Sequence, residues 1–274
     1  WQWFCVYDRD YVVGGALVVA GLLNNAFLWV FDRDSECLVQ DRSRILPLGS
    51  IYGGKAPLDE MGIRWPLESC SMNSTQDRTD VQFTLGTLDV DLRIRTDESQ
   101  PATAVCPTPI GRNITQKTVN GIVNGRLSFD ERTHTFEDAE GMLDYTRGLH
   151  PRETSWKWAI GGGRAKDGTP IGFNVVKEFN DERENVLWRD GEPYRLPSTE
   201  LSLPGADGTG TGRLRSRDGR IDLEFTPLGA RSESIDLGLI ASDYHQPIGH
   251  WSGSLTDRVI DELVGVCEDH YSKW

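Results

Sequence analysis

The chain has 274 residues, nine of them tryptophan, and a formal net charge of −13 at pH 7. Nucleic-acid binders neutralise phosphates with a basic stripe, so this acidic balance, without any Lys/Arg cluster, argues against a nucleic-acid partner. The most apolar stretch, residues 11–31, is interrupted by three glycines and two asparagines. It predicts two strands and a turn, and we expect no transmembrane segment.

Apolar and polar residues alternate with a period of two along most of the chain, which predicts strands. Leu88, Val90, Leu92 and Ile94 alternate with charged residues, and residues 221–225 repeat the pattern. Asp-Gly pairs at 167–168, 190–191 and 218–219 supply the positive φ that tight hairpins need. The second half is therefore expected to form an antiparallel meander that closes into a ligand-sized barrel or cup. A flat two-sheet sandwich is the competing arrangement.

Two further segments set the predicted organisation. The stretch 101–115 contains three prolines and little periodicity, which predicts the connection between two domains, 1–112 and 113–274. In residues 256–274, Val259, Leu263 and Val266 recur at helical spacing. We therefore expect an all-β protein of two antiparallel β-barrel or β-cup domains with a short C-terminal helix.

The five cysteines are scattered and form no C-x-x-C pair. Neither a structural zinc site nor a disulfide framework is expected, which favours a cytoplasmic location. Two N-x-S/T sequons, at Asn73 and Asn113, point weakly the other way. The histidines lack H-x-H and H-E-x-x-H spacing, and no P-loop or dinucleotide fingerprint occurs, so no metal and no cofactor are predicted.

The densest group of reactive side chains lies between Asp144 and Trp158 and includes Tyr145, Arg147 and Trp156. Trp156 and Trp158 are two residues apart, so on a strand they share a face. If that face lines the barrel, a carboxyl such as Asp144 beside it would be poorly hydrated. Its neutral form, a usable general acid, would then be favoured. In the alternative, Asp144 bonds Arg147 or backbone amides in a loop that only closes the barrel.

Two other groups contain candidate ligand-binding residues. Asn174 lies in the otherwise apolar strand 171–176, where an amide costs free energy unless it is hydrogen-bonded. It could orient a ligand carbonyl, although such residues more often satisfy the backbone. His245, next to Gln246, is the histidine best placed to exchange a proton near neutral pH, but lone histidines are more often structural.

At these clusters the chain resembles the domain-of-unknown-function 2804 family. The motifs that carry the resemblance are Thr115–Lys117, Leu143–Gly148, Trp156–Ala159, Gly172–Asn174, Glu184–Trp188, Asp190-Gly191, His245–Gly249, Ser252-Gly253 and Glu268–Trp274. Family members usually carry an additional N-terminal segment, which implies a truncated first domain here. The family is distantly similar to lipocalin-like proteins that include carotenoid hydratases and natural-product cyclases. This similarity implies two lipocalin-like barrels acting on an apolar small molecule without metal or nucleotide.

We therefore expect a cofactor-independent enzyme that performs hydration, isomerisation or cyclisation by proton transfer. Asp144 is the expected acid, with Lys117 or His245 as its electrostatic or base partner. The residues expected to bind the ligand are Tyr145, Arg147, Trp156, Trp158, Asn174, Glu184, Asn185, Trp188 and Gln246. A non-catalytic carrier of a lipid or pigment is the alternative, and a packed scaffold without a cavity is a third.

Overall fold

The computed structural model describes residues 1–20, 23–63, 68–196, 198–205 and 209–273. Within these ranges nearly all regular structure is β-strand, and the helical element is one 3₁₀ turn, η1, at Asn180–Glu182. The all-β prediction is confirmed. The turn predicted inside residues 11–31 falls at 21–22, outside the described residues.

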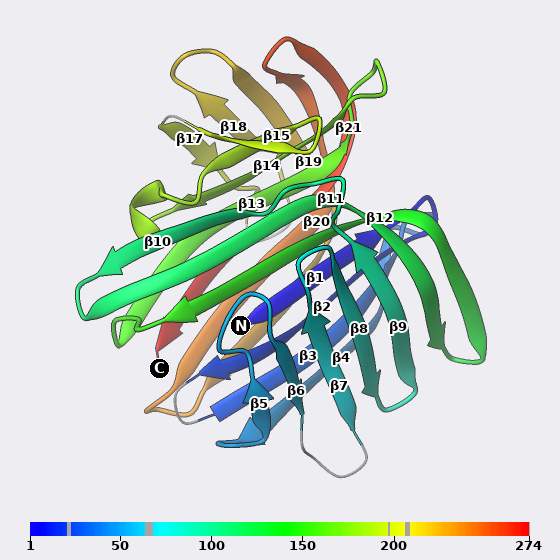
Figure 1. The fold of residues 1–274 in the computed structure, drawn as a ribbon, viewed down its shortest axis with the longest axis vertical. Helices are drawn as coiled ribbons and strands as arrows, with labels where there is room; N and C mark the ends of the chain where they lie inside the picture. The colour runs from blue at the N-terminus through cyan, green and yellow to red at the C-terminus, as the bar shows by residue number, and fades with distance from the viewer. Residues whose placement is uncertain (21–22, 64–67, 197, 206–208, 274) are drawn as a thin grey trace. The chain divides into compact units, whose positions relative to one another are not determined.

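The strands form two antiparallel sheets, each curled into a half-barrel (Figure 1). The first sheet has the order β4-β3-β2-β1-β12-β11-β9-β8-β7-β6-β5, with β10 paired to β11, and the second has the order β16-β15-β14-β13-β21-β20-β19-β18-β17. The strands are β1 Gln2–Tyr7, β2 Tyr11–Ala20, β3 Leu23–Asp32, β4 Cys37–Pro47, β5 Ile51–Gly53, β6 Glu60–Ile63, β7 Ser69–Ser74, β8 Arg78–Leu85, β9 Leu88–Arg95, β10 Ala102–Thr108, β11 Gly111–Phe129, β12 Arg132–Gly148, β13 Glu153–Arg164, β14 Pro170–Lys177, β15 Val186–Arg189, β16 Glu192–Arg195, β17 Thr199–Ser202, β18 Gly212–Ser216, β19 Ile221–Asp236, β20 Ala241–Leu255 and β21 Arg258–Lys273.

Two compact units divide the chain. Unit 1 comprises Trp1–Pro101 with Thr115–Arg147, and unit 2 comprises Ala102–Ile114 with Gly148–Trp274. Strand β1 pairs with β12 in unit 1, and β13 pairs with β21 in unit 2. This pairing brings residues that are more than a hundred positions apart onto neighbouring strands. The assignment of 1–112 and 113–274 as independent domains stays a prediction.

The core of unit 1 lies on one face of its sheet, because apolar side chains alternate with polar ones along most strands. In β9, Leu88, Val90, Leu92 and Ile94 are buried in this core, and the charged residues between them lie at or near the surface. Strand β1 is different, since all six of its residues are buried. Phe4 belongs to the core cluster, whereas the neighbouring positions point to the opposite face.

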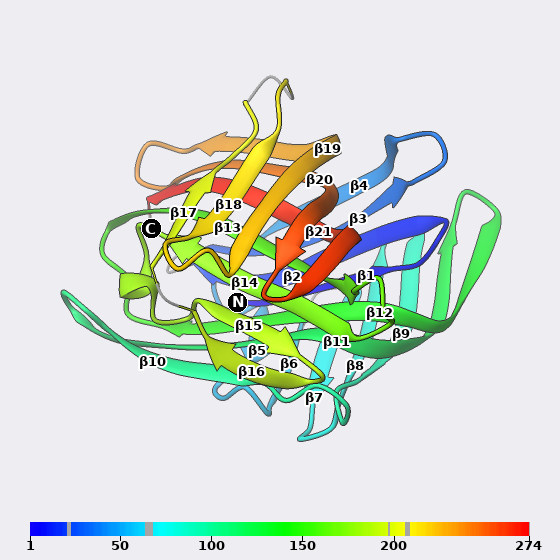
Figure 2. The ribbon, with the colours of Figure 1, turned by 90° about the horizontal axis from the view of Figure 1, so that it is seen from above.

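Unit 2 is built in the same way. Its core contains Phe173 and Trp251, whose rings meet edge to face with centroids 5.1 Å apart. Strands β19, β20 and β21 lie side by side in both views (Figures 1 and 2). Residues 171–176 of β14 and 263–268 of β21 are buried on both faces. These doubly buried segments position the side chains described below.

The predicted C-terminal helix is wrong. Residues 258–273 form strand β21, which pairs with β13 on one side and β20 on the other. The helical spacing of Val259, Leu263 and Val266 is fortuitous, since Val259 is exposed and the other two are buried on opposite faces of the strand. Ladder hydrogen bonds on both edges and a β-branched run outweigh the weak helical periodicity.

The substitution Gly265→Ala distinguishes a helix from a strand at residues 258–273, because it changes the free energy of unfolding in opposite directions in the two structures. In a helix, alanine stabilises by about 1 kcal/mol relative to glycine. In the paired strand, the added Cβ would lie 2.2 Å from the carbonyl oxygen of Ile160, a backbone atom that cannot move aside. We expect denaturant unfolding to show a loss of about 1–3 kcal/mol. Val259→Ala at an exposed position of the same strand is the control, and a stabilised Gly265→Ala protein would contradict the strand.

Candidate active site

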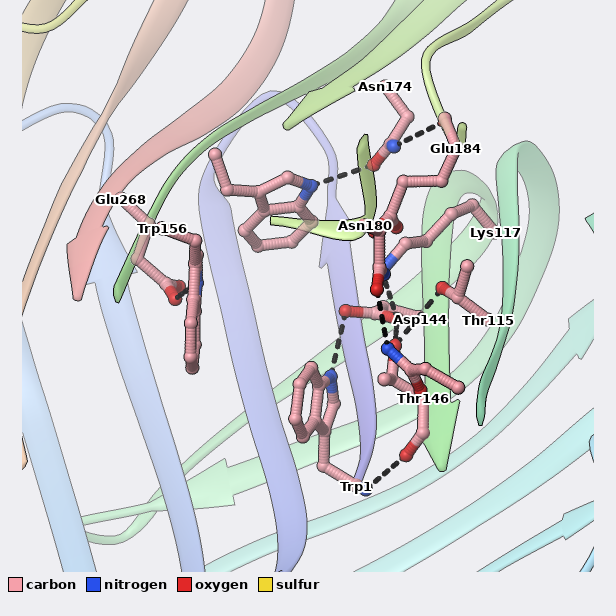
Figure 3. Close-up of polar contacts among 12 residues, drawn as sticks. Trp1, Thr115, Lys117, Asp144, Thr146, Trp156, Asn174, Asn180, Glu184 and Glu268 are labelled. Atoms are coloured by element: carbon pink, nitrogen blue, oxygen red, sulfur yellow. Dashed lines mark hydrogen bonds and ion pairs between the residues drawn. The ribbon is translucent and has the colours of Figure 1, made fainter. Parts of the chain in front are cut away.

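A buried ion pair between Lys117 and Asp144 is the centre of the polar cluster in unit 1 (Figure 3). Lys117 lies on β11 and is 4% exposed, and Asp144 lies on β12 and is 6% exposed. The Lys117 ammonium donates directly to Asp144 Oδ1. The structure thus brings together two of the three residues predicted to be catalytic.

Further donors complete the surroundings of the Asp144 carboxyl. Trp1 Nε1 donates to Oδ2 over 3.0 Å, and the Thr146 hydroxyl lies 3.2 Å from Oδ1. Thr115 Oγ1 is 3.0 Å from the Thr146 hydroxyl and extends the network. Donors to both oxygens stabilise the ionised carboxylate. Both oxygens of the Asp144 carboxyl therefore have hydrogen-bond partners, rather than lying against bare indole faces as the sequence suggested.

This ion pair lies on the face of the sheet opposite the core of unit 1. Asp144 is directly opposite Trp3 in the β1–β12 ladder, whereas the next pair, Phe4 and Leu143, packs in the core. Lys117 and the core residue Val123 are both odd-numbered positions of β11, yet they lie on different faces. Asn120 between them has φ of 56°, a backbone irregularity that reverses the alternation.

Tyr145 and Arg147 alternate with Asp144, and therefore point away from it. The Tyr145 hydroxyl and Arg147 Nη1 each donate to the carbonyl oxygen of Gly54 over 3.1 Å. Tyr145 also lines a cavity of about 40 Å³ together with Gln2, whose buried Oε1 has no hydrogen-bond partner among the described residues. A space of this size suits a few ordered waters rather than an organic substrate.

The polar cluster of unit 2 is centred on a second buried carboxylate, Glu268 of β21. Trp156 Nε1 donates to Glu268 Oε1 over 2.7 Å, and Gln246 Nε2 donates to Oε2 over 2.9 Å. His270 Nδ1 lies 3.4 Å from Oε1, and its ring is tilted against Trp156 with centroids 4.3 Å apart. Gln246 is fully buried, and its Oε1 has no protein partner in the described part of the chain.

A chain of hydrogen bonds runs beside this carboxylate (Figure 3). Trp158 Nε1 donates to Asn174 Oδ1 over 2.7 Å, and Asn174 Nδ2 donates to the carbonyl oxygen of Glu184 over 2.9 Å. The Glu184 carboxylate accepts from Asn180 Nδ2 over 2.5 Å. Asn113 Nδ2 donates to Asn180 Oδ1 over 2.8 Å and ends the chain.

Both tryptophans lie on the face of the second sheet opposite its core. Trp158 is directly opposite Glu268, whereas the next pair, Ala159 and Cys267, belongs to the core cluster. The indoles therefore do not line the apolar interior of unit 2. They form part of a mixed wall of aromatic rings, amides and carboxylates on its other face.

The remaining predicted residues have separate positions. Asn185 Oδ1 accepts from the backbone N–H of Val176 over 2.8 Å, and Trp188 is fully buried on β15. His245 is half-buried, and its Nδ1 is 2.7 Å from the Ser232 hydroxyl. It lies in unit 2, on the opposite face of the sheet from Gln246. His245 and the Lys117–Asp144 pair therefore belong to different units.

A groove of about 1130 Å³ opens in unit 2, a size suited to a small-molecule ligand. Its wall includes Phe179, Asn180 and Thr154. Phe179 packs on Trp156 with ring centroids 5.5 Å apart, and Asn180 is the residue bonded to Glu184. The groove is thereby connected to both the Glu268 cluster and the Trp158 chain. Glu178 and Asn180–Glu182 have positive φ, a cluster of left-handed residues typical of functional sites.

Sequence reasoning assigned no site role to Asn180, Thr115, Glu268 or His270, although the last three lie in motifs that carry the family resemblance. Glu268 and His270 were hidden by the incorrect helix, in which the acids were assigned to a solvated face. A strand reading of the same segment would have placed Glu268 and His270 on one face by their spacing of two. Asn180 lies near Asn174 and Glu184 in the sequence, but no local signal identifies its partner Asn113, 67 positions away.

The described residues contain no group of three or more His, Cys, Asp or Glu side chains arranged to hold a metal ion. None of their helical segments has the length and apolar character needed to cross a membrane.

The chain belongs to a family described as "Domain of unknown function (DUF2804)", whose model matches residues 1–274. None of the curated proteins matches it significantly. Kievitone hydratase from Nectria haematococca has a similar structure, with a TM-score of 0.59 at 10% identity over 100% of this chain and 88% of its own. CghA in complex with Sch210972 has a TM-score of 0.59 at 13% identity over 99% and 87%. At these identities the likeness establishes the lipocalin-like fold alone.

Removing one partner of the buried ion pair is expected to be costly. Lys117→Met leaves the Asp144 carboxylate buried without its counter-charge, which should lower the free energy of unfolding by about 3–5 kcal/mol. Adding Asp144→Leu should recover most of that loss. Urea unfolding followed by tryptophan fluorescence measures both variants. Lys166→Met, which breaks the exposed Lys166–Asp261 pair, is the control and should cost less than about 1 kcal/mol. Equal losses at Lys117 and Lys166 would contradict the description of a buried pair.

Acid should destabilise the protein through His150, whose ring stacks on Phe179 with centroids 5.5 Å apart. Burial lowers the pKa of His150 from 6.5 to about 4. As pH falls from 6.5 toward 4, the unfolded chain takes up a proton that the folded chain does not, so stability decreases. His150→Phe should reduce the drop in thermal midpoint between pH 7 and pH 4.5. The half-buried His245→Phe is the control, and an unchanged drop in His150→Phe would refute the assignment.

Proposed function

We propose that this DUF2804 protein is an enzyme that acts on a small molecule by proton transfer, performing hydration, isomerisation or cyclisation with its own side chains. The buried Lys117–Asp144 ion pair is the observation that supports the proposal most directly. A buried pair adds little to stability compared with apolar residues of similar volume, so stability alone does not explain it. It also lies outside the unit's apolar core, and buried ionisable clusters of this kind are typical of functional sites.

The sequence suggested Asp144 as the acid, but because the Lys117 ammonium donates a hydrogen bond to Asp144, we propose the reverse roles. Lys117 gives a proton to the substrate, and the Asp144 carboxylate accepts one from the substrate or, in a hydration, from the attacking water. Transfer across their hydrogen bond then restores the original pair, so no external acid or base is consumed. Trp1 and Thr146 hold the carboxylate in place meanwhile. Acid–base assistance of this kind typically contributes about 10²–10⁴-fold to a rate.

Taken by itself, the polar cluster of unit 2 is suited to a polar group on an otherwise apolar molecule. The unpartnered Gln246 Oε1 would accept a hydrogen bond from a substrate hydroxyl, which would relieve the cost of leaving that oxygen buried and unpaired. Trp156 and Trp158 would contact apolar parts and stabilise developing positive charge through their ring faces. Asn174, Glu184 and Asn185 position this wall. His245 remains a proposed base partner on the other face of the sheet.

Unit 2 taken by itself contains a groove of about 1130 Å³, a size suited to a small organic molecule. Kievitone hydratase and CghA share the fold, and the first name denotes a small-molecule enzyme. This structural similarity is consistent with the proposal, but the proposal itself rests on the chemistry of the side chains described above.

Asp144→Asn should abolish turnover and leave ligand affinity nearly unchanged, because the amide keeps the shape of the carboxyl but cannot accept a proton at neutral pH. The ligand is obtained by native mass spectrometry of the protein incubated in an extract of its own host. Affinity is then followed by tryptophan fluorescence, and turnover by mass change. We expect a loss of at least about 10²-fold in kcat. Asp91→Asn, an exposed position on β9, is the matched control.

Two outcomes would overturn the proposal. A ligand that binds and returns chemically unchanged would make the protein a carrier, and full activity in Asp144→Asn would remove the ion pair from the chemistry. Thermal unfolding of each variant shows whether a loss of activity merely reflects a loss of folded protein.

A further inference from the structure

The imidazole of His270, on β21, is held by four neighbours. Its Nε2 lies 3.0 Å from the Ser242 hydroxyl and 2.9 Å from the Ser272 hydroxyl. The ring is tilted against Trp156 and meets Tyr244 edge to face, with centroids 4.3 Å and 5.2 Å apart, respectively. The His270 side chain is 14% exposed. The ring is therefore positioned by its surroundings and still reaches solvent.

The other ring nitrogen of His270 faces Glu268. Nδ1 lies 3.4 Å from Glu268 Oε1, and among the described residues it has no hydrogen-bond partner. Both oxygens of Glu268 accept hydrogen bonds from groups with fixed protons, Trp156 Nε1–H and Gln246 Nε2–H. The carboxyl is therefore an acceptor towards His270. Two acceptors that face each other repel, so this contact favours the tautomer with a proton on Nδ1.

A proton on Nδ1 leaves the lone pair on Nε2, where the ring can take up a proton. A carboxylate that holds Nδ1–H in this way orients the histidine base of serine hydrolases and stabilises its imidazolium. Catalytic hydrogen bonds are often long or poorly aligned in the absence of substrate and shorten when it binds. The 3.4 Å separation of His270 Nδ1 from Glu268 Oε1 is compatible with such a role.

The groove of unit 2 adjoins this imidazole on two sides. Thr154 lines the groove and is directly opposite Ser272, whose hydroxyl contacts Nε2. Phe179 also lines the groove and packs on Trp156, the indole that contacts the ring. Rotation of the half-buried Ser242 side chain about one bond would open Nε2 to a molecule in the groove.

The charged groups near the ring favour a positive charge on it. The residues that contact the ring from β13 and β20 are uncharged. On β19, Arg231 and Glu233 pair with each other over 3.2 Å, and Arg231 lies 5.2 Å from the centroid of the Tyr244 ring. Among the charged side chains that the structure describes, Glu268 is the one in contact with His270. Its carboxyl would stabilise the imidazolium that forms when His270 takes up a proton.

We propose that His270 is a second proton-transfer residue of this enzyme, acting on a substrate in the unit 2 groove, with Glu268 as its positioning residue. Nε2 takes a proton from a C–H or O–H bond of the substrate, whose electron pair remains on the substrate. The imidazolium then returns the proton to another substrate atom, so the step is an isomerisation that consumes no other reactant. The inference rests on the proposed function but not on the Lys117–Asp144 pair, which belongs to unit 1.

Nuclear magnetic resonance tests the tautomer without any ligand. Long-range ¹H–¹⁵N spectra of the full chain, labelled in its imidazole nitrogens, show which ring nitrogen carries the proton, and His270→Gln identifies the signal. In alkaline buffer we expect the proton on Nδ1. Glu268→Gln should move it to Nε2, because the glutamine amide can donate to Nδ1. Asp269→Asn, an exposed neighbour on the other face, is the control and should change nothing. A proton on Nε2 in the unmodified protein would overturn the inference.

Diethyl pyrocarbonate, which acylates unprotonated imidazole nitrogen, tests access to Nε2. Peptide mass mapping of the folded protein should find His270 modified. A His270 that is modified only after the protein unfolds would overturn the inference, because a substrate in the groove could not reach it either.

Turnover is measured in an extract of the protein's own host by following the mass of the compound that changes. His270→Gln keeps a side chain of similar length but cannot exchange a proton near neutral pH, so the rate should fall at least about 10²-fold. Glu268→Gln should lower the rate by a smaller factor and shift the pH dependence of kcat, which a purely structural role would not do. Asp269→Asn should retain full activity, and thermal unfolding checks that each variant is folded.

The outcomes separate this inference from the proposed function. Full activity in His270→Gln, with Asp144→Asn inactive, would overturn this inference alone. An inactive His270→Gln with an active Asp144→Asn would support it and remove the ion pair from the chemistry. Loss in both variants would support both groups as parts of one reaction, and no turnover by the unmodified protein would overturn both.

Discussion

The candidate site depends on the burial of both faces of the central strands. A strand sends alternate side chains to opposite faces, so a strand buried on both sides serves two environments at once. In β1 and β12 one environment is the apolar core that contains Phe4 and Leu143, and the other contains Asp144. In β13 and β21 the same alternation separates Ala159 from Trp158. Each unit therefore has an apolar core on one face of these strands and a buried polar cluster on the other face.

Buried polar groups of this kind must satisfy one another, and they do so through partners that are remote in sequence. Asp144 receives its donors from β11 and from Trp1, and Glu268 receives two from β13 and β20. Such networks cost free energy when any member is missing, and so they define one arrangement of the strands rather than adding much stability. Among the described residues, Gln246 Oε1 and His270 Nδ1 of the Glu268 cluster have no hydrogen-bond partner. The proposed ligand group bonds to the Gln246 oxygen.

The hairpin turns of unit 2 are of two kinds. Asp-Gly hairpins serve geometry, since they supply positive φ and backbone bonds. The tip at Leu237–Leu239, between β19 and β20, instead carries two exposed leucines.

The sequence by itself determined the all-β class, many of the strands and several hairpins, because period-two alternation and Asp-Gly turns are local signals. It also singled out Asp144, Lys117, Trp156 and Trp158 as candidate site residues, although it expected the two indoles to form an apolar wall inside the barrel. It misassigned residues 256–274 as a helix, because valines and leucines spaced by three or four also fit a strand buried on both faces. Only the tertiary structure decided which face each side chain occupies, since a single left-handed residue such as Asn120 reverses the alternation. The pairing of β13 with β21 likewise decided that Glu268 meets Trp156, 112 positions away, because strand register is set by the packing of whole sheets and leaves no mark at either residue.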